Sequence, residues 1–216
     1  MIQAVLFDMD GLMFGTEQVY VDGFLDAGRK LDIPITTGLL ALLRGTGIAE
    51  CRQIFNNAIP GGYYDTARAI CLDYVDQYLQ TRGVPVKPGL TEVLTWLQAR
   101  HIPAVLATST ARDKAMKLLD MAGIREYFAG FTFGTEVAHP KPAPDIFLAA
   151  AAAADADPMH CVVLEDSRNG LRAAKAAGCT AIVVPDLDPA PPKELGLWDH
   201  QVPRLDLAIR VLEAML

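Results

Sequence analysis

The chain has 216 residues, of which 51% are hydrophobic and 21% are charged. These fractions exclude a disordered polypeptide and provide enough apolar side chains for a sizeable core. Lysine and arginine total 19 against 26 aspartates and glutamates, so the formal net charge is −7, which disfavours nucleic acid and anionic membranes as partners. An anionic substrate therefore needs a local positive field from a metal ion, a lysine or backbone N–H groups.

The start of the chain and the cysteines favour a cytoplasmic location. The first ten residues lack the basic region of a signal peptide and contain two aspartates, and no apolar run approaches the length of a membrane span. No CxxC pair is present, which argues against a zinc or redox motif. We expect small buried thiols at the four widely separated positions Cys51, Cys71, Cys161 and Cys179.

Short apolar segments alternate with amphipathic segments along most of the chain. This alternation is typical of an α/β protein with a doubly wound, Rossmann-like parallel sheet. Glycines at 89, 123 and 178 mark helix boundaries. In chain order, the predicted strands are 4–7, 102–107, 131–133, 161–164 and 180–184, and the predicted helices are 90–100, 111–122, 144–154 and 171–177.

One region interrupts the alternation, because residues 16–82 have a helical pattern throughout and contain no convincing strand. Gly15 precedes this region and Gly83 follows it. We therefore expect an α/β core of residues 1–15 and 84–216, with an inserted α-helical cap domain of residues 16–83. An insert after the first strand of an open sheet is expected to cover the carboxyl ends of the strands, where such sheets bind ligands.

Acidic pairs follow two of the predicted strands. Asp8 and Asp10 come directly after the first strand, and Glu165 and Asp166 end the strand that begins at residue 161. Since the carboxyl ends of parallel strands share one edge, we expect four carboxylates to converge there. Carboxylates at this density would repel one another without a cation, and oxygen ligands suit Mg²⁺.

Two further segments supply groups that bind phosphate. Thr108, Ser109 and Thr110 end the second strand before a helix, so their hydroxyl and N–H groups can receive phosphate oxygens. Lys141 lies in the sequence His-Pro-Lys-Pro-Ala-Pro-Asp, where prolines stiffen its backbone. The residues alone thus predict a site for phosphate and Mg²⁺.

Four segments together resemble, in order and spacing, the motifs of the haloacid dehalogenase superfamily. They are Asp8-Met9-Asp10-Gly11, Thr108-Ser109, Lys141-Pro142-Ala143-Pro144-Asp145 and Leu164-Glu165-Asp166-Ser167. The resemblance extends over essentially the whole chain. It is strongest with the branch of phosphatases and phosphomutases that includes beta-phosphoglucomutase and carries a small helical cap after the first strand.

This resemblance implies a Mg²⁺-dependent phosphatase that hydrolyses a small phosphorylated metabolite through an aspartyl-phosphate. Asp8 is then the nucleophile, and Asp10 protonates the leaving alkoxide and later activates water. Thr108 binds the phosphoryl oxygens, and Lys141 offsets their charge. An aspartate at position 10 also separates this chain from dehalogenases and phosphonate-cleaving members.

The resemblance also implies the ligands of the metal and the remaining contacts of the phosphate. Asp8, Glu165 and Asp166 hold Mg²⁺, with Glu165 acting directly or through water, and Asp10 contributes its backbone carbonyl. Ser109 joins Thr108 and Lys141 in binding phosphate. Gly11 also belongs to the phosphate site, where it supplies the backbone freedom that the turn after the first strand requires.

Residues of the cap are expected to select the substrate. Arg44 and Gly45 belong to a segment that resembles the glycine-containing specificity loop of relatives, and Thr16 and Tyr20 lie near the start of the cap. Gly15 stands where relatives frequently carry an acidic residue, so a hinge contact is lost or the cap is loosened.

Three functions remain open at this point. The first is the phosphatase, and the second is a mutase that moves phosphate within a sugar phosphate. Tyr20 and Ile48 count against the mutase, because similar mutases carry a histidine and an arginine at these positions. The third is a non-catalytic binding protein of the same fold, against which the complete set of motif residues argues.

Overall fold

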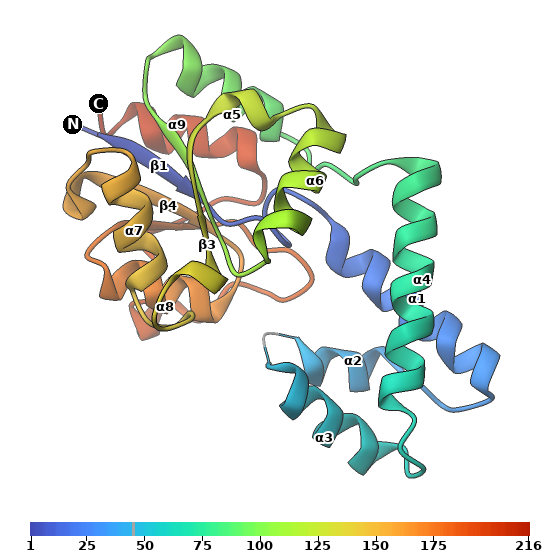
Figure 1. Cartoon of the computed structure of the whole chain (residues 1–216). Coiled ribbons are helices and arrows are strands. Elements are labelled where there is room, and N and C mark those ends of the chain that lie inside the picture. The colour runs from blue at the N-terminus through green and yellow to red at the C-terminus, as the bar shows by residue number, and fades with distance from the viewer. Residues whose placement is uncertain (45) are drawn as a thin grey trace. The chain divides into compact units, whose positions relative to one another are not determined.

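The structure is a computed structural model that describes residues 1–44 and 46–216. The chain divides into two compact units. In Figure 1 the colour of the ribbon follows residue number from the amino terminus to the carboxyl terminus. The first unit comprises Met1–Gly15 and Val84–Leu216, and the second comprises Thr16–Gly83. The amino-terminal strand therefore belongs to the same unit as residues 84–216.

The first unit is built on a sheet in which six strands, counted over the described residues, all run parallel in the order β3-β2-β1-β4-β5-β6. The central strand β1 is covered on both faces, which explains why its sequence, AVLF, is continuously apolar rather than alternating. The strands are β1 (Ala4–Phe7), β2 (Ala104–Thr108), β3 (Phe128–Phe133), β4 (Cys161–Glu165), β5 (Thr180–Val183) and β6 (His200–Gln201).

Helices cover both faces of this sheet, as right-handed crossovers between parallel strands require. The helices α7 and α8 pack against each other, and their apolar side chains join those of β1, β2, β4 and β5 in one core. The helices α5 and α9 lie beside each other on the other face (Figure 1). The helices of this unit are α5 (Leu90–Ala99), α6 (Arg112–Ala122), α7 (Asp145–Ala153), α8 (Arg168–Ala176) and α9 (Ala208–Glu213).

The predicted doubly wound α/β fold is confirmed, with differences at the ends of elements. The strand expected from residue 131 begins at Phe128, and the helix expected from residue 171 begins at Arg168. Ser167 explains the earlier helix start, because its hydroxyl accepts the N–H of Gly170 and caps the first turn. The short elements β6 and α9 were not predicted, and β6 consists of two exposed edge residues with no apolar pattern.

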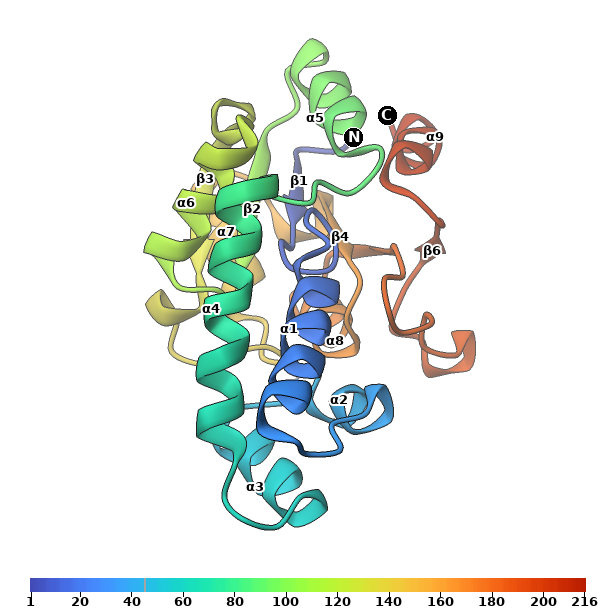
Figure 2. The same ribbon diagram turned by 90° about the vertical axis from the view of Figure 1, so that its right-hand side faces the viewer.

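The second unit is helical, as expected. Its helices α1 and α4 pack side by side over much of their lengths (Figure 2). Their close approach requires Gly23, since a Cβ there would lie 2.9 Å from Cys71 Sγ. The rings of Phe24, Phe55 and Tyr64 form the aromatic part of the core. The helices of the unit are α1 (Thr16–Leu31), α2 (Thr37–Leu43), α3 (Ile48–Ala58) and α4 (Tyr64–Arg82).

All four cysteines are free and buried, which confirms the expectation of buried thiols. Within residues 1–44 and 46–216, none of the helices combines the length and the apolar character needed to cross a bilayer.

Candidate active site

The candidate site lies at the carboxyl ends of three adjacent strands, β1, β2 and β4. Asp8 follows the last residue of β1, and Thr108 and Glu165 are the last residues of β2 and β4. The backbone N–H of Asp8 donates to the carbonyl of Leu164 at 3.1 Å, which continues the ladder between β1 and β4 by one residue. The sheet register thus places Asp8 beside Glu165, as expected for residues at the shared edge of parallel strands.

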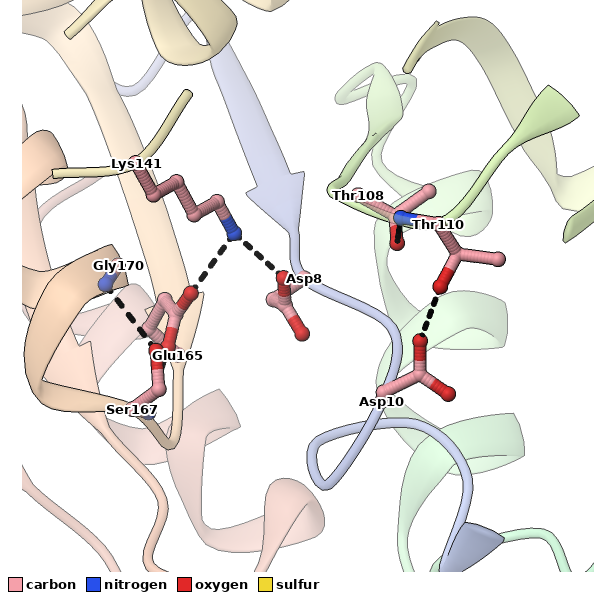
Figure 3. Close-up of polar contacts among 8 residues, drawn as sticks. All are labelled: Asp8, Asp10, Thr108, Thr110, Lys141, Glu165, Ser167 and Gly170. Atoms are coloured by element: carbon pink, nitrogen blue, oxygen red, sulfur yellow. Dashed lines mark hydrogen bonds and ion pairs between the residues drawn. The ribbon is translucent and has the colours of Figure 1, made fainter. Parts of the chain in front are cut away.

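Lys141 connects these two carboxylates, although it comes from a loop far along the chain. Its Nζ lies 2.5 Å from Asp8 Oδ1 and 2.8 Å from Glu165 Oε1 (Figure 3). The side chain of Lys141 is only 6% exposed, and its ammonium lies 4.8 Å from the centre of the Phe147 ring. Lys141 is therefore a buried, oriented cation rather than a surface lysine.

Burial and charge shift the pKa values of this group in defined directions. Burial raises the pKa of Asp8 to about 7, and the charge of Glu165 adds to this rise while Lys141 opposes it. Burial by itself lowers the pKa of Lys141, but the attraction of Asp8 and Glu165 outweighs it and raises the pKa above its usual range. The ammonium therefore stays charged, and Asp8 needs nearby positive charge to remain an anion.

Glu165 is fully buried, and both of its oxygens are hydrogen-bonded. Oε1 receives the bond from Lys141, and Oε2 accepts the backbone N–H of Ser167 at 2.6 Å. The carboxylate packs over the Cα of Gly170, where an added Cβ would lie 1.6 Å from Oε1. Glu165 thus fixes Lys141, and Gly170 leaves the space in which Glu165 lies.

Three carboxylates form a cluster suited to a cation. Oxygens of Asp8, Glu165 and Asp166 all lie within 4.8 Å of one another. The turn after β1 leaves room for Asp166, because Gly11 has φ +84° and a Cβ there would lie 2.1 Å from Asp166 Oδ2. Three close carboxylates fit a hard divalent cation such as Mg²⁺, which takes oxygen ligands.

Asp10 lies apart from this cluster, so the expected convergence of four carboxylates holds for three. Its Oδ2 accepts the hydroxyl of Thr110 at 2.6 Å, and the N–H of Thr110 donates to Thr108 Oγ1 at 3.1 Å (Figure 3). The hydroxyl of Thr110 thus satisfies one oxygen of Asp10, while the charge of Asp10 contributes to the rise in the pKa of Asp8. Ser109 is exposed between the two threonines.

Sequence reasoning did not single out the specific contributions of Thr110 and Gly170. Thr110 was predicted only as part of a hydroxyl-bearing segment, and its partner Asp10 is 100 residues away in the chain. The glycine at 170 follows the capping Ser167 by three residues, and this pattern by itself indicates only a helix start.

The predicted substrate residues of the cap belong to the helical unit and are described within it. Tyr20 and Arg44 line the same cavity of about 190 Å³, together with Phe24, Leu43 and Tyr64 among others. Thr16 is buried at the start of α1 and does not line this cavity. Gly45 lies outside the described residues.

Comparisons with known proteins show the family to which the chain belongs. A family model for haloacid dehalogenase-like hydrolases matches residues 2–178. The chain is 30% identical over 183 residues to the phosphorylated carbohydrates phosphatase of Thermotoga maritima, covering 84% of each protein. It is 31% identical over 193 residues to the beta-phosphoglucomutase of Bacillus subtilis, covering 85% of this chain and 83% of that protein. A solved structure of CbbY from Rhodobacter sphaeroides with phosphate has a TM-score of 0.75 at 28% identity, covering 95% and 96% of the two chains.

Proposed function

Because the chain belongs to the haloacid dehalogenase-like hydrolases, as its four motifs suggested, we propose that it is a Mg²⁺-dependent phosphatase acting on a small phosphorylated metabolite. One observation carries the proposal: a buried Lys141 ammonium binds Asp8 and Glu165, which are two of the three carboxylates in the cluster with Asp166. Lys141 and a divalent cation held by the three carboxylates would together offset the negative charge of the cluster, which an acidic chain needs in order to bind an anionic ester.

Asp8 is the proposed nucleophile. A carboxylate oxygen of Asp8 attacks phosphorus as the bond between phosphorus and the ester oxygen breaks, which leaves a phosphoryl group on Asp8. Lys141 donates to Asp8 already and offsets the charge of the transferring group. Thr108, at the end of β2, and the neighbouring Ser109 bind the phosphoryl oxygens, together with the backbone at Gly11.

Asp10 is the proposed general acid and base. It gives a proton to the leaving alkoxide, then takes a proton from the water that attacks phosphorus and releases phosphate from Asp8. These proton transfers require a carboxylate that is held off the metal. The hydrogen bond from Thr110 to Asp10 does this, so Thr110 is a positioning residue.

The proposed ligands of Mg²⁺ are the carboxylates of Asp8, Glu165 and Asp166 and the backbone carbonyl of Asp10. When bound, Mg²⁺ supplies positive charge that stabilises the phosphoryl group during transfer. The cluster of three carboxylates supports this assignment, since their mutual repulsion is relieved by a divalent cation.

The proposed substrate is a sugar phosphate or a similar phosphomonoester. The name of the Thermotoga maritima relative, which acts on phosphorylated carbohydrates, supports this class. We assign Thr16, Tyr20, Arg44 and Gly45 of the helical unit to recognition of the organic part. The four free, buried thiols favour a reducing compartment and hence the cytoplasm as the place of action.

The proposal is tested by phosphate release from an aryl phosphate and from a panel of sugar, polyol and nucleoside monophosphates and phosphoglycolate, with Mg²⁺ present. Asp8→Asn should abolish release, because it removes the nucleophile. Asp73→Asn is a matched control, since Asp73 is exposed on α4 of the helical unit. Full activity of Asp8→Asn would overturn the assignment, and absence of release over the whole panel would favour a binding protein.

A mutase is the second candidate, which the similarity to the Bacillus subtilis beta-phosphoglucomutase favours. In a mutase, the phosphoryl group on Asp8 passes to a sugar hydroxyl rather than to water. Labelling the protein with ³²P and adding a sugar phosphate distinguishes the two reactions, because only a mutase forms labelled sugar bisphosphate. Release of free phosphate alone would rule out this candidate.

A further inference from the structure

A second ion pair of low exposure lies at the same edge of the sheet, outside the residues that the proposed mechanism uses. Lys87 Nζ binds Asp186 Oδ1, and the side chains of the two residues are 23% and 11% exposed. Lys87 lies in the segment that re-enters the first unit after residue 83, and Asp186 follows β5 by three residues. Neither residue belongs to any of the four sequence motifs.

The carboxylate of Asp186 is bound by Lys87 through one of its two oxygens. Its second oxygen, Oδ2, is buried and accepts no hydrogen bond within residues 1–44 and 46–216. An ionised carboxylate with one unsatisfied buried oxygen is strongly destabilised if its partner cation is removed. The pair therefore differs from exposed ion pairs, which contribute little.

On the Lys87 side, the pair is connected to the loop that carries Asp10. The N–H of Lys87 donates to the carbonyl of Met13 at 2.9 Å, and the N–H of Gly15 donates to the carbonyl of Pro85 at 2.8 Å. Residues 13–15 are in turn bonded to the Asp10 turn, since the N–H of Gly11 donates to the carbonyl of Phe14 at 2.9 Å. The segment 85–87 thus braces the loop after β1.

On the Asp186 side, the pair is connected to Glu165. The N–H of Val184 donates to the carbonyl of Glu165 at 2.8 Å, two residues before Asp186. The ion pair therefore joins the backbone that carries Asp10 to the backbone that carries Glu165. Among the ion pairs recorded between described residues, this is the one that joins the segment 85–87 to the loop after β5.

We propose that Lys87 and Asp186 are positioning residues, which hold the Asp10 loop in register with Asp8, Lys141 and Glu165. This inference rests on the proposed phosphatase function for its effect on turnover. Neither residue touches the reacting atoms. Their contribution is geometric, because an acid and base displaced by about 1 Å loses up to about a hundredfold in rate.

The first test measures turnover of an aryl phosphate in Lys87→Met. We expect kcat to fall by about tenfold to a hundredfold while KM changes by less than about threefold, because positioning of the acid and base is lost and ground-state binding is not. Lys87→Arg keeps the charge and should restore most of kcat. Lys175→Met is the matched control, since it removes the more exposed Lys175–Asp199 pair of the same unit, whose side chains are 35% and 36% exposed, and should leave kcat unchanged.

The second test is hydrogen exchange of the backbone amides of Gly15 and residue 87. These amides form the hydrogen bonds between the loop after β1 and the segment 85–87, so their exchange rates measure this contact independently of activity. In Lys87→Met both amides should exchange at least about tenfold faster, while amides of β1 keep their protection. If this variant does not fold, the double variant Lys87→Met/Asp186→Leu removes both charges and serves in its place, with the same expected loss of kcat and of protection.

Wild-type kcat or unchanged amide exchange in the variant that folds would overturn the proposal, as would failure of Lys87→Arg to restore kcat. If the wild-type protein releases no phosphate from any ester, the proposed function fails. The exchange experiment then still decides whether the ion pair braces the loop.

Discussion

Gly170→Ala tests the packing beneath Glu165. An alanine at 170 favours helix α8 by propensity, yet its Cβ would lie 1.6 Å from Glu165 Oε1 and 2.0 Å from Cδ. The carboxylate is not a flexible end that can move aside, because it is fully buried and held by Lys141 at 2.8 Å and by the N–H of Ser167 at 2.6 Å. The substitution therefore displaces a buried charge from both of its partners.

Two opposing contributions set the magnitude of this effect. Replacing glycine by alanine within a helix stabilises it by about 1 kcal/mol. Breaking a buried ion pair costs about 3–5 kcal/mol. We expect Gly170→Ala to lower the free energy of unfolding by about 2–4 kcal/mol, a large part of the about 5–15 kcal/mol typical of a domain. Phosphatase activity should fall at least about a hundredfold, because Lys141 loses the carboxylate that orients it.

Urea unfolding and release of phosphate from an aryl ester measure the two effects. Gly38→Ala is the control, because Gly38 is an exposed glycine of α2 where an added Cβ meets only Thr36 Oγ1, at 3.9 Å. That variant should gain up to about 1 kcal/mol of stability and keep full activity. If Gly170→Ala unfolds at the same urea concentration as the wild type and is equally active, the packing argument is wrong.

Three further predictions concern other parts of the molecule. Thr110→Val should lower kcat by at least about tenfold because Asp10 loses the hydrogen bond that orients it, and Thr110→Ser should restore it; equal kcat values would contradict this role. Partial burial raises the pKa of Asp199, but hydrogen bonds from Lys175 and from the N–H of Ala181 outweigh it and hold the pKa below its usual range. Asp199→Asn should therefore cost about 0.5–1 kcal/mol near neutral pH, and the difference in urea midpoint from the wild type should shrink below about pH 4 as the carboxylate is protonated; a difference independent of pH would refute this assignment. Removal of divalent metal with EDTA should abolish phosphate release and lower the thermal midpoint, and Mg²⁺ should restore both, whereas full activity after chelation would exclude a metal-dependent mechanism.

The sequence by itself determined the fold class and the types of group in the site. Strands covered on both faces must be apolar throughout, as in Ala4–Phe7 and Cys161–Leu164, so they stand out against the amphipathic helices. Polar residues at the ends of parallel strands share one edge, so Asp8, Thr108 and Glu165 were placed correctly without coordinates. The ends of elements were less certain, because caps such as Ser167 depend on side-chain contacts.

Only the tertiary structure decided how these groups are paired. Lys141 reaches Asp8 across 133 residues of chain, and Thr110 reaches Asp10 across 100. Local periodicity reports the burial of one segment against its surroundings, and it contains no information on which distant side chain meets which. For this reason the sequence did not predict three features of the structure. They are the position of Asp10 outside the cluster of three carboxylates, the space that Gly170 leaves for Glu165, and the Lys87–Asp186 ion pair.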